Sequence, residues 1–194
     1  MEKTNKQTMI ICAYPASGKT YICNKYNKLK GENSCIVKLL LGLDFWSDIV
    51  FLDMDAIKLN KFYKNSTGNV IDDYIAFVKK NMGKADIIFI NSNKSIRKAL
   101  RDNNIKYFMV YPELNMKEEI IQRMIKKGDN IHSINFQKKN FENMVKSIDK
   151  ECCKYNIPYQ KLNKITPYIN LEYIVDLLKY EMLLEELLGR VIDD

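Results

Sequence analysis

Four short apolar runs along the chain, rich in Ile, Val, Phe and Met, predict buried β-strands. They read TMIICAY (8–14), DIVFLDMD (48–55), ADIIFINS (85–92) and IKYFMVYP (105–112). Such nearly continuous apolar runs are typical of strands that are covered on both faces of a sheet. A fifth run, IPYQKL (157–162), alternates apolar and polar residues and predicts an edge strand.

Helical patterns separate these runs. Helices are predicted over residues 18–30, 70–82, 94–103, 115–128, 138–155 and 170–188. Strands that alternate with helices require parallel pairing, so the predicted fold class is α/β: a three-layer α/β/α sandwich with a mainly parallel five-stranded sheet. Ligands of such sheets bind beyond the carboxyl ends of the strands, so we expect functional residues directly after strands. Residues 31–48 fit a strand, a helix or an insertion.

The helix predicted over 115–128 has residues at its two ends that favour a helix start and a helix stop, respectively. Asn115 is expected to be the N-cap, with Glu118 three positions later as in a capping box. Lys126 and Lys127 fill the last turn, where cations favour the helix dipole, and Gly128 is expected to stop the helix.

Length and composition favour a single globular domain and disfavour a membrane or secreted protein. The 194 residues, 46% of them hydrophobic, predict a single domain over 1–194. No run approaches the roughly 18 apolar residues that cross a bilayer, and the first apolar stretch is too short and too near Lys19 for a secretion signal. Five cysteines without a CxxC pair or Cys/His ligand spacing predict neither disulfides nor a zinc site. We therefore expect a soluble, cytoplasmic protein with no membrane partner.

The charge favours an anionic ligand. The net charge is +7 and the pI is near 9.0, which fits a nucleotide, a nucleic acid end or an acidic surface. Almost all of the positive charge is Lys, and Arg occurs only at positions 97, 101, 123 and 190. Because the planar guanidinium suits bidentate phosphate recognition, each Arg is a candidate ligand-binding residue.

The octet AYPASGKT (13–20) lies between the first predicted strand and the first predicted helix. A phosphate-binding loop needs a buried strand, a tight turn whose amides surround a polyphosphate, a Lys, and a hydroxyl for magnesium where the next helix begins. The octet meets these needs in order, with Lys19 for the β- and γ-phosphates and Thr20 for Mg²⁺. The residues assigned to nucleotide binding are Pro15, Ala16, Ser17, Gly18, Lys19 and Thr20.

Ala13 departs from the pattern G-x-x-x-x-G-K-[ST], which begins with Gly. A methyl group is tolerated there if φ is negative, and it costs on the order of 1 kcal/mol if φ must be positive. The strand before the octet and the helix after it still favour the phosphate-loop interpretation.

With these motifs the sequence resembles the P-loop kinases of nucleosides and nucleoside monophosphates, the adenylate-kinase-like branch of the P-loop nucleotide hydrolases. The segments YPASGKT, LDMD, INSNKSIRKAL and VYPELNMKEEIIQRMIKKG also look like those of small phage-borne P-loop proteins presumed to be nucleotide kinases. The resemblance covers about residues 8–165. It implies a P-loop type of fold, ATP and Mg²⁺ as cofactors, and transfer of a phosphoryl group to a small acceptor.

Two carboxylates follow the second predicted strand, in FLDMD. Asp53 and Asp55 are two positions apart, so in an extended strand they face the same way and could serve magnesium or orient a substrate hydroxyl. Asp55 could instead only cap the next helix. The resemblance assigns Asp55 to the acceptor and Asp53 to water-mediated Mg²⁺ contact. If IIFINS is the strand beside the loop, Asn91 or Ser92 takes the magnesium-side position and a carboxylate is missing there.

Further basic residues are candidates for binding phosphates. Ser92, Lys94 and Arg97 follow the third strand, where they could bind an acceptor phosphate or could be ordinary solvated residues. Arg123 and Lys127 are four apart on one helix face. The resemblance places them on a lid, about residues 115–140, in which Arg123 is catalytic and covers the triphosphate. Family members usually have Arg where this chain has Lys127.

The sequence leaves three functions open. The first is an ATP- and Mg²⁺-dependent kinase of a nucleoside or (deoxy)nucleoside monophosphate. The second is a polynucleotide end kinase or another nucleic-acid-binding ATPase, supported by the basic and aromatic run KLNKFYK (58–64). The third is a P-loop protein that binds nucleotide without catalysis. The oligomeric state is open between a monomer and a homodimer.

Overall fold

The computed structural model describes residues 8–26, 50–54, 69–174 and 176. The chain divides into two compact units, of which the first comprises residues 1–28 and 49–169 and the second residues 29–48 and 170–194. All elements named below belong to the first unit. In the second unit, the described residues 171–174 and 176 are helical, consistent with the start of the helix predicted over 170–188. The single-domain expectation stays a prediction.

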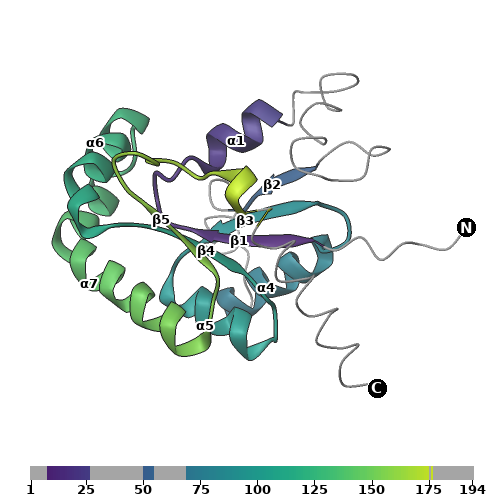
Figure 1. Cartoon of the computed structure of the whole chain (residues 1–194). Helices are drawn as coiled ribbons and strands as arrows, with labels where there is room; N and C mark the ends of the chain where they lie inside the picture. Colours follow the sequence, from purple (N-terminus) through teal and green to yellow (C-terminus); the bar gives the residue numbers. More distant parts are fainter. Residues whose placement is uncertain (1–7, 27–49, 55–68, 175, 177–194) are drawn as a thin grey trace, which may run out of the picture. The chain divides into compact units, whose positions relative to one another are not determined.

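A five-stranded, all-parallel sheet forms the first unit (Figure 1). The strands are β1 (Met9–Ala13), β2 (Phe51–Asp53), β3 (Ile87–Asn91), β4 (Phe108–Pro112) and β5 (Tyr159–Leu162). Their order is β2-β3-β1-β4-β5, and each lies within one of the five predicted runs. The predicted α/β fold class is therefore confirmed, with β5 at an edge as its alternating pattern indicates.

Helices connect the strands and lie on both faces of the sheet (Figure 1). They are α1 (Lys19–Tyr26), α4 (Val70–Asn81), α5 (Lys94–Asp102), α6 (Lys117–Lys127) and α7 (Ile131–Tyr155), with a short 3₁₀ helix η1 (Leu114–Met116) before α6. Successive strand residues point to opposite faces. Ile10 and Cys12 of β1 therefore pack in one core cluster with residues of α4, α5, α6 and α7, whereas the equally buried Ile11 does not belong to that cluster.

Two local predictions need correction. Asn115 is not the N-cap of α6, because that cap is Met116 without a side-chain hydrogen bond, and the amide of Asn115 instead donates to Glu113. The helix predicted from 138 begins at Ile131, since the side chain of Asn130 caps it by accepting from the amide of His132. Gly128 does stop α6, at a φ of 75° that glycine adopts without strain.

The strand order determines where a ligand can bind. The connection after β1 leads toward β2 on one side, whereas that after β4 leads toward β5 on the other. The chain therefore switches direction between β1 and β4, and in open parallel sheets ligands usually bind beyond the carboxyl ends of the strands at such a point. No helix in the described ranges is long and apolar enough to cross a membrane.

Several predictions fall outside the described residues. They concern the role of residues 31–48, the run 58–64, the acceptor carboxylate Asp55, and the helix predicted over 170–188 beyond residue 176.

Candidate phosphate-binding site

The octet connects β1 to α1 at the carboxyl edge of the sheet, and Ala13 is the last residue of β1. Ala13 pairs with Asn91 of β3 on one side and with Val110 of β4 on the other. It is not among the positive-φ residues of the described chain, so its methyl group causes no backbone strain. The departure from the Gly-first pattern is therefore tolerated because this position is still strand.

Strain lies three residues later, where sequence reasoning did not expect it. Ala16 has a φ of 60°, in the left-handed region that costs a non-glycine residue on the order of 1 kcal/mol. Gly18 has a φ of 106°, which only glycine adopts readily. A Cβ on Gly18 would also lie 3.5 Å from the Tyr168 ring, so the octet is packed closely against residue 168.

Lys19 and Ser17 are both buried inside this turn. The side chain of Lys19 is 4% exposed, and its Nζ donates to the carbonyl oxygens of Ala13 at 2.7 Å and Tyr14 at 3.0 Å. The hydroxyl of Ser17 has no hydrogen-bond partner among the described residues, although it is fully buried. Because an unpaired buried hydroxyl costs about 1–3 kcal/mol, its position in the turn that leads into α1, two residues before Lys19, fits an anion that completes the site.

Thr20 joins the octet to the second predicted strand. Its Oγ1 donates to Oδ2 of Asp53 at 2.7 Å. Of the two strands that pair with β1, β3 ends at Asn91 and β4 ends at Pro112, so neither ends in a carboxylate. Asp53 reaches Thr20 from β2, one strand further out. A hydroxyl and a carboxylate oxygen are hard ligands of the kind that Mg²⁺ uses together with substrate phosphates, so the pair fits a magnesium position.

Cys23 lies one turn after Thr20 on α1 and is buried. Burial and the nearby carboxylate of Asp53 raise the pKa of the Cys23 thiol to about 12, against a smaller lowering by Lys19. Its thiol therefore stays protonated near neutral pH and is a poor nucleophile.

Tyr14, the second residue of the octet, connects the octet to α7. Its buried hydroxyl donates to Oε1 of Gln137 at 2.6 Å, and its ring meets Phe141 edge to face at 5.8 Å. Burial raises the pKa of Tyr14, so the hydroxyl stays a donor. Residues 128–140, expected to complete a lid, thus comprise a short turn and the first ten residues of α7, and this part of α7 packs on the octet through Gln137.

Arg123 of α6 reaches the octet from the side of the segment after β5. One terminal nitrogen donates to the carbonyl of Pro167 at 2.6 Å and to that of Ala16 at 3.4 Å, and the other pairs with Glu119. The guanidinium also lies 4.1 Å from the centre of the Tyr168 ring. Its groups are therefore engaged within the chain. The exposed Lys127, 3.4 Å from Asp129, forms an ion pair of its own.

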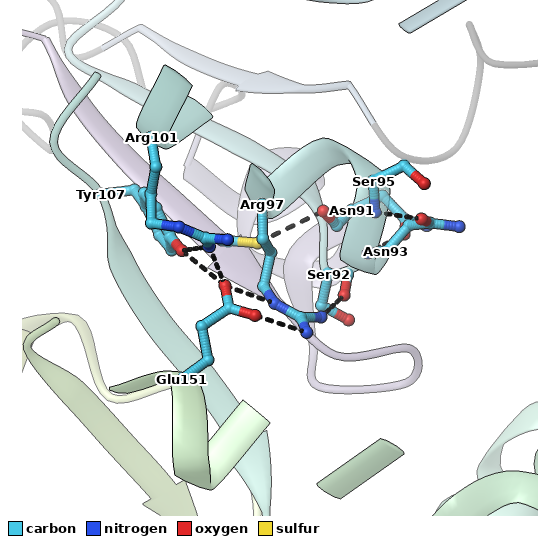
Figure 2. A network of polar contacts seen from close by, with 9 residues as sticks. Asn91, Ser92, Asn93, Ser95, Arg97, Arg101, Tyr107 and Glu151 are labelled. Carbon is cyan, nitrogen blue, oxygen red and sulfur yellow. Dashed lines mark hydrogen bonds and ion pairs between the residues drawn. The ribbon is translucent and has the colours of Figure 1, made fainter. Parts of the chain in front are cut away.

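Of the three residues predicted to bind an acceptor phosphate, Ser92 and Arg97 are in contact with each other but buried, and only Lys94 is exposed. Lys94 is exposed, whereas Ser92 is 1% and Arg97 is 3% exposed. Arg97 donates to both carboxylate oxygens of Glu151, at 3.1 and 3.0 Å, and to the carbonyl of Ser92 (Figure 2). Because its guanidinium is buried and paired, Arg97 is a structural residue here, and the expectation of phosphate binding loses its support.

Glu151 is the centre of that network and was missed by sequence reasoning. It also accepts from Arg101 and from the hydroxyl of Tyr107, the latter at 3.1 Å (Figure 2). The sequence signal was weak, since an acid in a predicted helix is usually solvated. An acid on a helix position that otherwise faces the core, as Ile148 and Cys152 do, was the only indication.

The comparisons with known proteins do not assign a family. No family model matches the chain, and no curated protein matches it. Among solved structures, the chain is similar to the crystal structure of an uncharacterized protein from Eubacterium ventriosum ATCC 27560. The two are 14% identical over 90% of this chain and 98% of that chain, with a TM-score of 0.40. A likeness at that level carries no functional information.

Proposed function

We propose that the chain is an ATP- and Mg²⁺-dependent phosphotransferase that acts on a nucleoside or (deoxy)nucleoside monophosphate. The observation that carries phosphate binding is the buried hydroxyl of Ser17 without a partner among the described residues, beside the buried Lys19 at the start of α1. An anion at this point would satisfy the hydroxyl, neutralise the ammonium group and lie at the N-terminus of the helix, where negative charge is favoured.

The other residues of the octet fit the same chemistry. Lys19 would leave the carbonyl oxygens of its own loop and neutralise the β- and γ-phosphates of the donor. Thr20 and Asp53 would hold magnesium, which supplies charge neutralisation on the phosphate oxygens when bound. Phosphoryl transfer depends mainly on positioning and on stabilising developing charge, and these residues provide both without covalent chemistry.

The choice of acceptor rests on the resemblance and on FLDMD. Asp53 ends β2 at the carboxyl edge of the sheet, the edge at which the octet follows β1. Asp55 is proposed to orient the acceptor hydroxyl or phosphate. Lys94 remains a candidate for the acceptor, since its side chain is exposed.

The test is removal of the Lys19 charge. Lys19→Met should lower phosphoryl transfer at least about a thousandfold with the fold intact, because the donor phosphates lose their main neutralising charge. Lys25→Met is the matched control: it removes the same charge from an exposed position of the same helix, and turnover should be retained. Unchanged turnover in Lys19→Met would contradict the proposal.

The acceptor is found by an ATP-consumption screen with mass identification of the product. The acceptors are nucleosides, the common monophosphates and a 5′-hydroxyl oligonucleotide. A phosphorylated nucleoside or monophosphate supports the proposal, whereas product from the oligonucleotide alone would make the protein a polynucleotide kinase. Slow ATP loss with no phosphorylated product from any acceptor would identify a non-catalytic nucleotide-binding protein.

A further inference from the structure

The octet contains a strained residue that something must hold. With a φ of 60°, Ala16 lies in a conformation that isolated alanine rarely adopts. Such residues persist only where surrounding contacts fix them. Among the contacts on residues 16–18 are those made by Arg123 of α6 and by the post-β5 segment, defined as residues 163–169.

The post-β5 segment is bonded to the octet directly. The amide of Ile169 donates to the carbonyl of Ser17 at 3.1 Å, and the Tyr168 ring packs beside Gly18. The segment is also bonded to the sheet, since Gln160 of β5 donates to the carbonyl of Tyr168 at 3.2 Å. The loop therefore rests on a segment that is itself fixed to the sheet.

Arg123 connects the octet to the post-β5 segment. Its guanidinium bonds the carbonyl of Pro167 at 2.6 Å, reaches that of Ala16 at 3.4 Å, and lies over the Tyr168 ring at 4.1 Å. Its side chain is 12% exposed. One terminal nitrogen makes both carbonyl contacts and the other pairs with Glu119, while the guanidinium lies over the Tyr168 ring, and an ammonium group has no planar face for such stacking.

We propose, resting on the proposed function, that Arg123 is a positioning residue of the phosphate loop and not a lid residue that covers the triphosphate. The contacts of Arg123 with Ala16, Pro167 and Tyr168, named here the Arg123 clamp, hold Ala16 in its left-handed conformation before any ligand binds. The loop amides are thereby ordered in advance, so that the bound anion does not have to bear the cost of ordering them.

The two roles predict different behaviour of conservative variants. If Arg123 acts by its charge on phosphate, Arg123→Lys should retain most of the affinity and Arg123→Met should lose it. If Arg123 acts as a clamp, both variants should lose it alike, because neither keeps the planar group that donates to the carbonyls while it stacks on Tyr168. Tyr168→Leu should then also weaken binding, although it leaves the charge in place.

The experiment measures two quantities in the full-length chain. The first is hydrogen exchange of the Ile169 amide without ligand, and the second is the affinity for inorganic pyrophosphate by calorimetry. We expect about tenfold faster exchange and about tenfold weaker pyrophosphate binding in Arg123→Met and Arg123→Lys. Lys146→Met is the matched control, because Lys146 forms the same i,i+4 pair with Glu142 on an exposed helix face. It should change neither quantity.

A second substitution tests whether the strain at Ala16 is what Arg123 offsets. Ala16→Gly removes the cost of the left-handed conformation, so in the Arg123→Met background it should recover about fivefold in both quantities. No recovery, or a wild-type response in Arg123→Lys, would overturn the clamp. If the wild-type chain does not bind pyrophosphate, the proposed function is contradicted. The exchange rates of the Ile169 amide in the wild type and the Arg123 variants then still show whether Arg123 holds the loop. Circular dichroism confirms that each variant is folded.

Discussion

Two polar clusters of the first unit differ in how completely their groups are paired. The phosphate loop, residues 13–20, contains a buried hydroxyl without a partner among the described residues and a strained alanine. The Glu151 network consists of Arg97, Arg101, Tyr107 and Glu151, and its carboxylate accepts from all three partners. Both clusters contain basic residues that sequence reasoning connected with phosphate. Only the first leaves a polar group for a ligand to satisfy.

The difference between the two clusters shows how a structural buried cation can be told from one that binds a ligand. A buried charge that is fully paired contributes to the specificity or stability of the fold, and removing its partner is costly. A buried cation that donates to backbone carbonyls, as Lys19 does, can exchange those partners for an anion. Substitutions in the two clusters should therefore affect stability and binding in opposite ways.

The largest effect is expected on stability from the Glu151 network. Glu151→Gln leaves two guanidinium groups without their carboxylate, one of them 3% exposed, and should lower the free energy of unfolding by about 3–5 kcal/mol. Urea unfolding measures it. Glu142→Gln is the matched control on the same helix, an exposed pair with Lys146 whose loss should cost no more than about 0.5 kcal/mol. Equal values for the two variants would mean that the network is not a structural centre.

The next effect is on binding from the phosphate loop. Ser17→Ala removes the unpaired hydroxyl, so the free energy of unfolding should stay the same or rise by about 1 kcal/mol. The dissociation constant for pyrophosphate should increase about tenfold or more, because a hydrogen bond to a charged ligand is lost. Calorimetry and urea unfolding separate the two quantities, with the exposed Ser95→Ala as control. A loss of stability without a loss of affinity would place the hydroxyl in the same class as the Glu151 network.

The smallest effect concerns a third cluster, in which an exposed ion pair between α7 and β5 also contacts Tyr111 of β4. Lys161 pairs with Asp149 at 2.7 Å, and the hydroxyl of Tyr111 also donates to Asp149. These contacts lower the pKa of Asp149 and, on the other side of the pair, raise that of Lys161. The carboxylate therefore contributes stability above its unfolded pKa of about 3.9, and this is lost as the pH falls through the lower folded pKa.

Because both side chains are more than a third exposed, the pair should contribute no more than about 1 kcal/mol. Lys161→Met should reduce this acid-sensitive part of the unfolding free energy between about pH 5 and pH 2. Parallel pH profiles of the wild type and the variant in urea unfolding would show that the ion pair has no role in stability.

The amount that the sequence could predict differed between the fold and the site. The five strands and the fold class were predictable because continuous apolar runs report burial on both faces directly. The stop of α6 at Gly128 was also predictable, because only glycine is common in that conformation. The cap at Asn115 was not, since a 3₁₀ turn took the place of the first helical turn there. The pairing of Arg97 with Glu151 was not predictable either, because the two residues are 54 positions apart in the chain.

The sequence by itself determined the sheet, the position of the octet between β1 and α1, and the presence there of Gly18, Lys19 and Thr20. Local propensity and hydrophobic burial decide these features, and both can be read from neighbouring residues. Only the tertiary structure decided that Asp53 reaches Thr20 across an intervening strand, that Arg123 binds the loop's own carbonyls, and that Ser17 is buried without a described partner. Those features depend on strand order and on contacts between distant segments, which no local pattern of residues specifies.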